Sequence, residues 1–193
     1  MTISHQRLYQ ATCALHAAAE DEHRQQGAAA MAALFVPPTG PGQLYVFPDG
    51  MPPAEVLAAI ARAVGAVGIA VTGEVWESTP GINGPTLIGM PFADLPRPST
   101  DPDATEAILT TAAGIGHDGP IKLLRKTHIQ RTLRGTVLHE ATDLRTKIRD
   151  DGLAALLTLA LAAGSRQHRD GTGDTTALDP GLRPDDGDTG QAG

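Results

Sequence analysis

Hydrophobic residues recur along this chain with two different periods, and each period indicates a type of secondary structure. Between Ser4 and Gln26 they are spaced three and four positions apart, beginning with Leu8, Ala11 and Leu15, which is typical of an amphipathic helix. Ser4 is a favourable N-cap for this helix, and Gly27 is a favourable residue for ending it.

Three histidines fall within this predicted helix, at His5, His16 and His23. A spacing of seven residues places His16 and His23 on one face but about 10 Å apart along the axis, which is too far to bind one metal ion. We therefore expect them to be solvated side chains on the helix surface.

Alternating or continuously apolar segments predict six β-strands, of which Ile69–Ser78 has the clearest alternation. Its even-numbered residues, among them Glu74 and Trp76, should share one face, while Ile69 and Val71 share the other. The remaining strands are expected at residues 28–36, 43–48, 105–113, 121–132 and 136–141, and two further helices at about residues 49–64 and 153–163.

Short connections between the later strands favour antiparallel pairing. The sequence therefore predicts a single α+β domain over about residues 4–163, in which an antiparallel, twisted sheet of five or six strands packs helices on one face. Residues 164–193 are rich in Gly, Asp, Thr and Pro without apolar periodicity, so we expect a disordered acidic tail. The segment Leu153–Ala163 is apolar on all sides, which indicates burial in the domain or docking on a partner, for example in a homodimer.

Composition narrows the function classes. The formal net charge of −7 argues against general nucleic-acid binding, and no apolar segment reaches the roughly 20 residues needed to cross a membrane. Cys13 is the single cysteine, so no intramolecular disulfide or cysteine zinc cluster can form, which fits a reducing cytoplasm. The excess of Arg over Lys and the abundance of Ala indicate a GC-rich bacterial genome. Nucleotide-binding and dinucleotide-binding motifs are missing, so we predict no cofactor.

A more specific pattern lies in the middle of the chain. Glu74-Val-Trp76 falls within the central strand, and Pro98-Ser-Thr-Asp-Pro-Asp-Ala-Thr-Glu-Ala leads into the next strand. These segments resemble a pattern in a family of uncharacterised bacterial and phage proteins, E-x-W followed by P-S-x-x-P-D-R-x-E-A. The resemblance covers roughly residues 64–113, and Ala104 stands where the pattern has Arg. If that Arg pairs with a carboxylate in the relatives, the pairing is lost here. No activity is established for the group, and the resemblance therefore implies a similar fold of this block but no particular function.

The segment that begins at Pro98 also has a physical interpretation of its own. Its prolines hold the chain extended or turned, while Ser99, Asp101 and Asp103 can accept hydrogen bonds from nearby backbone N–H groups. The segment is then either a rigid corner that leads into the next strand or a corner whose polar side chains contact a ligand or partner.

The pair Glu74 and Trp76 is the strongest candidate for chemistry, because a carboxylate lies beside the single tryptophan of the chain. If their face of the strand lines a pocket, the apolar surroundings would raise the pKa of Glu74 and suit it to general acid or base catalysis. Glu106 or His128 would assist if the sheet brings them close. In the structural alternative, Glu74 pairs with a basic residue of a later strand or faces water.

The segment His139-Glu140-Ala-Thr-Asp143 differs from the H-E-x-x-H zinc motif in its last residue. Carboxylates can bind zinc, but the motif requires a helix, so that residues four positions apart share a face. The residues around Thr136 favour a strand instead, and no third ligand follows at a suitable spacing. We therefore expect no metal site here.

Several features bear on function. The missing catalytic motifs, the apolar segment near the C-terminus and the long loop after the central strand favour a small non-enzymatic accessory or binding protein of a bacterium or its mobile elements. Its partner would be an unknown protein or a small ligand, and neither nucleic acid nor a membrane. The alternative is a hydrolase-like enzyme that uses Glu74 with Glu106 or a histidine.

Overall fold

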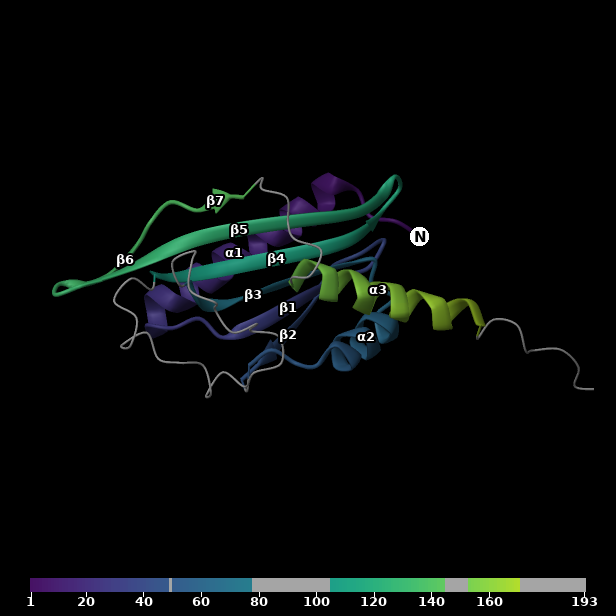
Figure 1. Cartoon of the computed structure of the whole chain (residues 1–193), viewed down its shortest axis with the longest axis horizontal. Helices are drawn as coiled ribbons and strands as arrows, with labels where there is room; N and C mark the ends of the chain where they lie inside the picture. Colours follow the sequence, from purple (N-terminus) through teal and green to yellow (C-terminus); the bar gives the residue numbers. More distant parts are fainter. Residues whose placement is uncertain (49, 78–104, 145–152, 171–193) are drawn as a thin grey trace, which may run out of the picture.

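An antiparallel sheet forms the centre of the molecule, because the alternating segments of the sequence pair with one another (Figure 1). The computed structural model describes residues 1–48, 50–77, 105–144 and 153–170. The strands are β1 (Met31–Val36), β2 (Gln43–Phe47), β3 (Gly68–Glu77), β4 (Thr105–Gly116), β5 (Gly119–Thr132), β6 (Gly135–Leu138) and β7 (Thr142–Asp143). Their order is β2-β1-β3-β4-β5-β6, with β7 also paired to β5, and every pairing is antiparallel. The predicted α+β class is confirmed.

The helices cover both faces of the sheet, so the expectation that they share one face is wrong. They are α1 (His5–Gln26), α2 (Ala54–Ala63) and α3 (Leu153–Asp170), and Figure 1 shows α1 behind the sheet with α2 and α3 in front of it. The physical reason lies in the central strands, which are apolar on both faces. On β3, Ala70 clusters with Leu8 and Leu15 of α1, whereas Ile69 clusters with Leu57 of α2. A sheet of this kind must be covered on both sides.

Helix α3 is buried in the core of its own chain. Leu157 and Leu161 are buried and cluster with Phe35 and Leu57, while Leu159 points outward. Of the two sequence alternatives, burial within the domain is therefore the one observed, and the apolar stripe of α3 gives no reason for a homodimer. Within the residues that the structure describes, no helix combines the length and the apolar character needed to cross a bilayer.

The ends of α1 follow the sequence signals, whereas the end of α3 does not. The Ser4 hydroxyl accepts a hydrogen bond from the backbone N–H of Arg7 at 3.2 Å, and Gly27 ends the helix with a left-handed φ of 79°. Helix α3 continues to Asp170, past the predicted start of the tail. A glycine inside a helix costs only about 1 kcal/mol, so Gly164 does not terminate it.

We expect Leu157→Ala to lower the free energy of unfolding by about 2–5 kcal/mol, because it opens a cavity between α3 and the rest of the core. Leu159→Ala is the matched control on the same helix and should change it by about 0.5 kcal/mol or less, since this side chain is 69% exposed. Urea denaturation at two protein concentrations measures both effects. Equal losses for the two variants, or a midpoint that rises with protein concentration, would contradict the internal role of α3.

Candidate functional site

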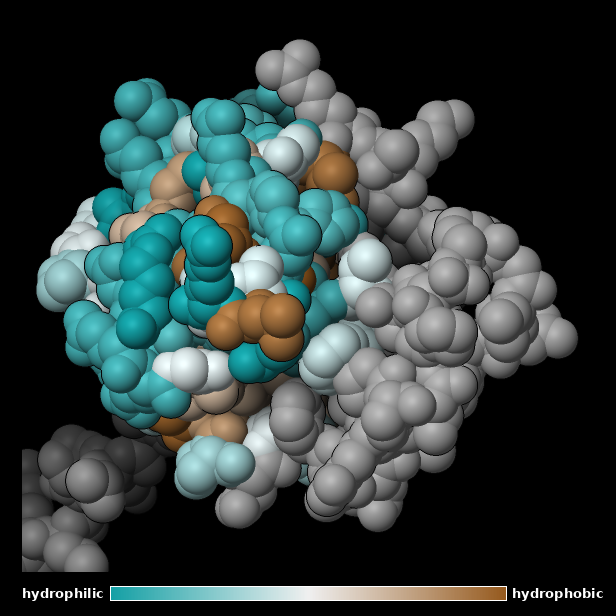
Figure 2. All heavy atoms as spheres, turned by 90° about the vertical axis from the view of Figure 1, so that its left-hand side faces the viewer, coloured by the Kyte–Doolittle hydropathy of each residue, from teal (hydrophilic) through white to brown (hydrophobic). Residues whose placement is uncertain are grey.

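A hollow of about 600 Å³ lies at the end of the sheet where β3 stops and β4 begins. The register of the strands creates it, since Trp76 lies opposite Glu106 and Glu106 lies opposite Ile129. Figure 2 views this end of the molecule, whose surface is mostly hydrophilic with isolated hydrophobic residues. The lining residues are Trp76, Thr105, Glu106, His128, Ile129, Gln130, Arg131 and His139. Three of the residues singled out from the sequence, Trp76, Glu106 and His128, therefore meet here.

Glu106 is held by the guanidinium of Arg131. Arg131 Nε donates to Oε2 of Glu106 at 2.6 Å, and its Nη2 donates to Oε1, so the two groups form a bidentate pair. The hydrogen bond to Glu106 raises the pKa of Arg131, although burial opposes it. Glu106 is 5% exposed and Arg131 is 52% exposed. The carboxylate is thus a buried counter-ion, and the cation is the member of the pair that faces outward.

Glu74 is occupied in a different way, by helix α1 and the chain that follows it. Its Oε1 lies 2.5 Å from Nδ1 of His23 and accepts the backbone N–H of Ala29 at 2.6 Å. Because a carboxylate only accepts, Nδ1 of His23 carries the proton. Glu74 therefore does meet a histidine, but on α1 and not on β5.

His23 is 2% exposed, which corrects the expectation of a solvated helix histidine. Its Nε2 is buried and has no hydrogen-bond partner. A carboxylate-oriented imidazole is the arrangement that general bases use, yet a substrate must come within hydrogen-bond reach of the free nitrogen. Burial of Nε2 prevents that approach, and His128, which lies opposite Ala107 on the other face of the sheet, is not part of the pair.

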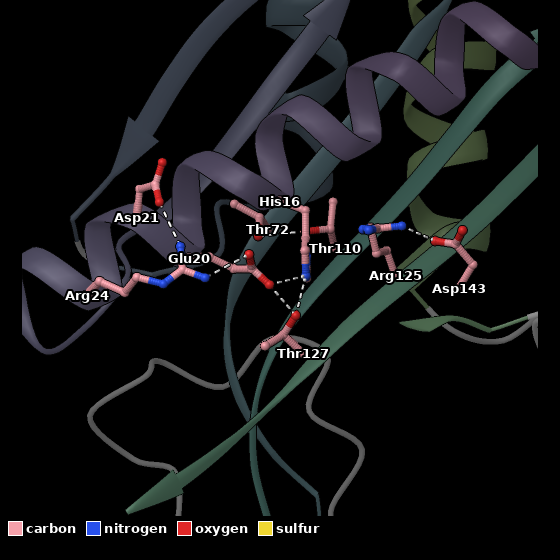
Figure 3. A network of polar contacts seen from close by, with 9 residues as sticks. All are labelled: His16, Glu20, Asp21, Arg24, Thr72, Thr110, Arg125, Thr127 and Asp143. Atoms are coloured by element: carbon pink, nitrogen blue, oxygen red, sulfur yellow. Dashed lines mark hydrogen bonds and ion pairs between the residues drawn. The ribbon is translucent and has the colours of Figure 1, made fainter. Parts of the chain in front are cut away.

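His16 lies at the centre of a second buried network, between α1 and three strands (Figure 3). It is 1% exposed, so its expected solvation is wrong as well. Its Nδ1 lies 2.8 Å from the hydroxyl of Thr110, which in turn lies 2.8 Å from the hydroxyl of Thr72. Its Nε2 lies 2.9 Å from the hydroxyl of Thr127, and that hydroxyl donates to Oε1 of Glu20. The network links α1 to β3, β4 and β5.

The carboxylate of Glu20 sets the direction of the hydrogen bonds in this network. Thr127 gives its single proton to Glu20, so it must accept from His16, and Nε2 of the ring therefore carries a proton. Burial lowers the pKa of His16, more than the nearby charge of Glu20 raises it. The Thr110 hydroxyl donates to Thr72 in the structure. In the neutral ring Nδ1 is an acceptor, so Thr110 would then have to turn its proton from Thr72 to His16.

The segment from His139 to Asp143 does not form the helix that the H-E-x-x-H motif requires. Strand β6 ends at Leu138 and β7 contains Asp143, so His139 and Asp143 do not share a helix face. Asp143 instead accepts hydrogen bonds from Arg125 at 2.6 Å and from the Tyr9 hydroxyl at 2.7 Å. Among the residues that the structure describes, no three His, Cys, Asp or Glu side chains lie in a group that could hold a metal ion.

The burial of His16 and His23 and the ion pair of Arg131 were not predicted from the sequence. For the two histidines, however, the sequence contains a signal. The buried stripe of α1 runs through Leu8, Thr12, Leu15 and Ala19, and His16 and His23 continue the same three- and four-residue spacing. This spacing indicates burial irrespective of polarity.

Some predicted residues lie outside the part of the chain that the structure describes. They are Ser99, Asp101 and Asp103 of the corner before β4, together with residues 171–193 of the expected tail. The family pattern around Pro98 therefore stays a prediction.

We expect the stability of the protein to fall as the pH drops below about 6.5, because burial lowers the pKa of His16 from that value. Below that pH, His16 of the unfolded chain binds a proton more readily than His16 of the folded chain. The stabilisation linked to neutral His16 is therefore present above about pH 6.5 and is lost as the pH falls through the folded-state pKa. Glu20, Arg125 and Asp143 also act on the ring, and all three remain in a His16→Gln variant.

Urea denaturation between pH 7.5 and about 4.5 should therefore show a shallower loss for His16→Gln than for the unmodified protein. His5→Gln, which changes an exposed histidine of the same helix, should follow the unmodified protein. A steep loss that persists in His16→Gln would assign the pH dependence to other groups. Nitrogen-15 NMR of the ring should show Nε2 protonated and Nδ1 bare at neutral pH.

We expect Tyr9 to ionise at a pKa of about 12, raised from 10.0 chiefly because its hydroxyl donates to Asp143. A Tyr45→Phe background leaves Tyr9 as the single tyrosine, so an ultraviolet titration reports on it alone. Asp143→Asn should bring the pKa back towards 10.0, since the amide carries no charge. An unchanged titration would show that β7 does not lie against α1 in solution.

Comparison of the sequence with protein-family models finds no match. Comparisons with curated proteins and with solved structures find none either. The function of this chain must therefore be inferred from its own residues and their geometry.

Proposed function

We propose that this chain is a non-enzymatic binding module that holds a small ligand in the hollow at the start of β4. The observation that carries the proposal is that both candidate acids already have partners, while the hollow that Glu106 lines is open. Glu106 is paired with Arg131, and Glu74 is paired with His23 and Ala29, so both carboxylates already have strong partners within the chain. The other residues that line the hollow are Trp76, Thr105, Ile129, Gln130, Arg131 and the two histidines His128 and His139.

The size and lining of the hollow support this proposal. Ligand sites usually enclose about 300–1,000 Å³ and combine apolar walls with a few polar groups. The hollow has about 600 Å³, and on the α1 face of the sheet it has Trp76 and Ile129 as apolar surface with Glu106 and Arg131 as charged groups. Gln130 and His128 also line it, but they alternate with these residues and belong to the opposite face. The negative charge of the chain and its single cysteine are consistent with a cytoplasmic protein that does not bind nucleic acid, which belongs to the same proposal.

The alternative is a hydrolase-like enzyme, and one observation favours it. Glu74 orients His23 through Nδ1, as a carboxylate does beside a general base. For catalysis, the chain would have to expose Nε2 of His23, which is buried in the folded structure.

Two measurements on the purified, untagged protein test the proposal. Native mass spectrometry should show a ligand or partner that leaves on mild activation, and a screen with ester, phosphoester and amide substrates should show no turnover. Turnover that Glu74→Gln and His23→Gln both abolish, while Glu22→Gln retains it, would refute the binding module and support the enzyme. Glu22 is the control, because it accepts the N–H of Ala30 and contributes no group to the His23 pair.

A further inference from the structure

The electrostatics of the hollow go beyond a general binding function. We infer that the hollow takes a small organic anion, whose carboxylate or phosphate group pairs with Arg131 and whose flat apolar part lies against Trp76. This inference rests on the binding function proposed above and adds the chemical class of the ligand.

Arg131 retains donors for such an anion. A guanidinium carries five N–H groups, and Glu106 receives one from Nε and one from Nη2, which leaves three. Because Arg131 is 52% exposed and Glu106 only 5%, a ligand entering the hollow meets the cation before the carboxylate. Glu106 also fixes the orientation of the guanidinium, so little conformational entropy is lost when an anion binds to its free edge.

Trp76 supplies the apolar wall next to this cation. It lies directly opposite Glu106 in the β3–β4 register, so the two side chains start about 5 Å apart on one face of the sheet. Ile129, opposite Glu106 on the other side, is buried and adds apolar surface to the same hollow. An aromatic wall and an oriented guanidinium that line one hollow match a ligand with a flat ring and one anionic group.

A cationic ligand fits this geometry poorly. It would need the Glu106 carboxylate, which is buried and already bound at both oxygens by Arg131. If a cationic ligand displaced Arg131, the Glu106 carboxylate would only exchange one cation for another, and its bidentate pair with Arg131 would be lost. A neutral ligand could lie against Trp76, but it would leave the free donors of Arg131 without an anionic partner.

The test uses three probes that share a ring and differ in charge: benzoate, benzamide and benzylamine. Trp76 is the single tryptophan, so its fluorescence reports on the hollow directly. We expect benzoate to bind roughly tenfold or more tightly than benzamide, in line with the strength of charge-assisted hydrogen bonds, and benzylamine to bind most weakly. Competition with inorganic phosphate then distinguishes the two anion types, since phosphate displaces benzoate only if the site also accepts a phosphate group.

Three variants separate charge from structure. Glu106→Gln removes the buried negative charge and frees the donors of Arg131, so benzoate should bind more tightly. The double variant Glu106→Gln with Arg131→Gln keeps two hydrogen-bonding side chains without a net charge, and the preference for benzoate over benzamide should disappear. Arg134→Gln, in the turn between β5 and β6, is the matched control and should leave the preference unchanged. Thermal unfolding verifies that each variant is folded.

Each failure has a distinct signature. Equal affinity for benzoate and benzamide, or tightest binding of benzylamine, would overturn the anion inference and leave the binding module in place. Weaker benzoate binding in Glu106→Gln would also overturn it, because the negative charge of Glu106 would then not oppose the ligand. No binding by any probe refutes the inference too, whereas turnover lost in Glu74→Gln refutes the proposed function itself.

Discussion

Helix α1 packs on the sheet through apolar side chains and through a buried polar network around His16, whose members are hydrogen-bonded to one another. Thr72, Thr110 and Thr127 come from three adjacent strands and converge on His16. A buried polar group without a partner costs about 1–3 kcal/mol, so the helix has one favourable rotation and position along its axis. The opposite face of the sheet, where α2 and α3 pack through apolar side chains, has no comparable directional constraint.

The sequence predicts the elements of this fold better than their arrangement. Periodicity suffices for strands and helices, because alternation and three- to four-residue spacing are local properties. Which face of the sheet each helix covers is not local, since β3 is apolar on both sides and accepts a helix on either. His16 and His23 were placed in solvent by their polarity, although their spacing belongs to the buried stripe. Their partners could not be predicted, because Thr110 lies 94 residues from His16 and Glu74 lies 51 residues from His23 in the sequence.

The pairing of Glu106 with Arg131, in contrast, follows from a local feature that the sequence contains. Strands β4 and β5 are joined by a two-residue turn, His117–Asp118, with Gly116 opposite Gly119. Such a turn fixes the register of the whole hairpin, which places Glu106 opposite Ile129 and diagonally across from Arg131. Trp76 joins them only through the β3–β4 register, and the chain between those strands is too long for its sequence to set that register.

The same physical requirement explains both the partners of the two candidate acids and the electrostatics of the hollow. A carboxylate buried as deeply as Glu106 can stay charged only beside a cation, and Arg131 reaches it from the exposed end of β5. Glu74, its diagonal neighbour on the same face, is satisfied by α1 and the backbone after it. The two acids are therefore structural anchors, one for the helix and one for a guanidinium. Because that guanidinium is anchored at the edge of an open hollow that Trp76 also lines, a requirement of folding also orients a cation there, and this supports the proposed recognition of an anion.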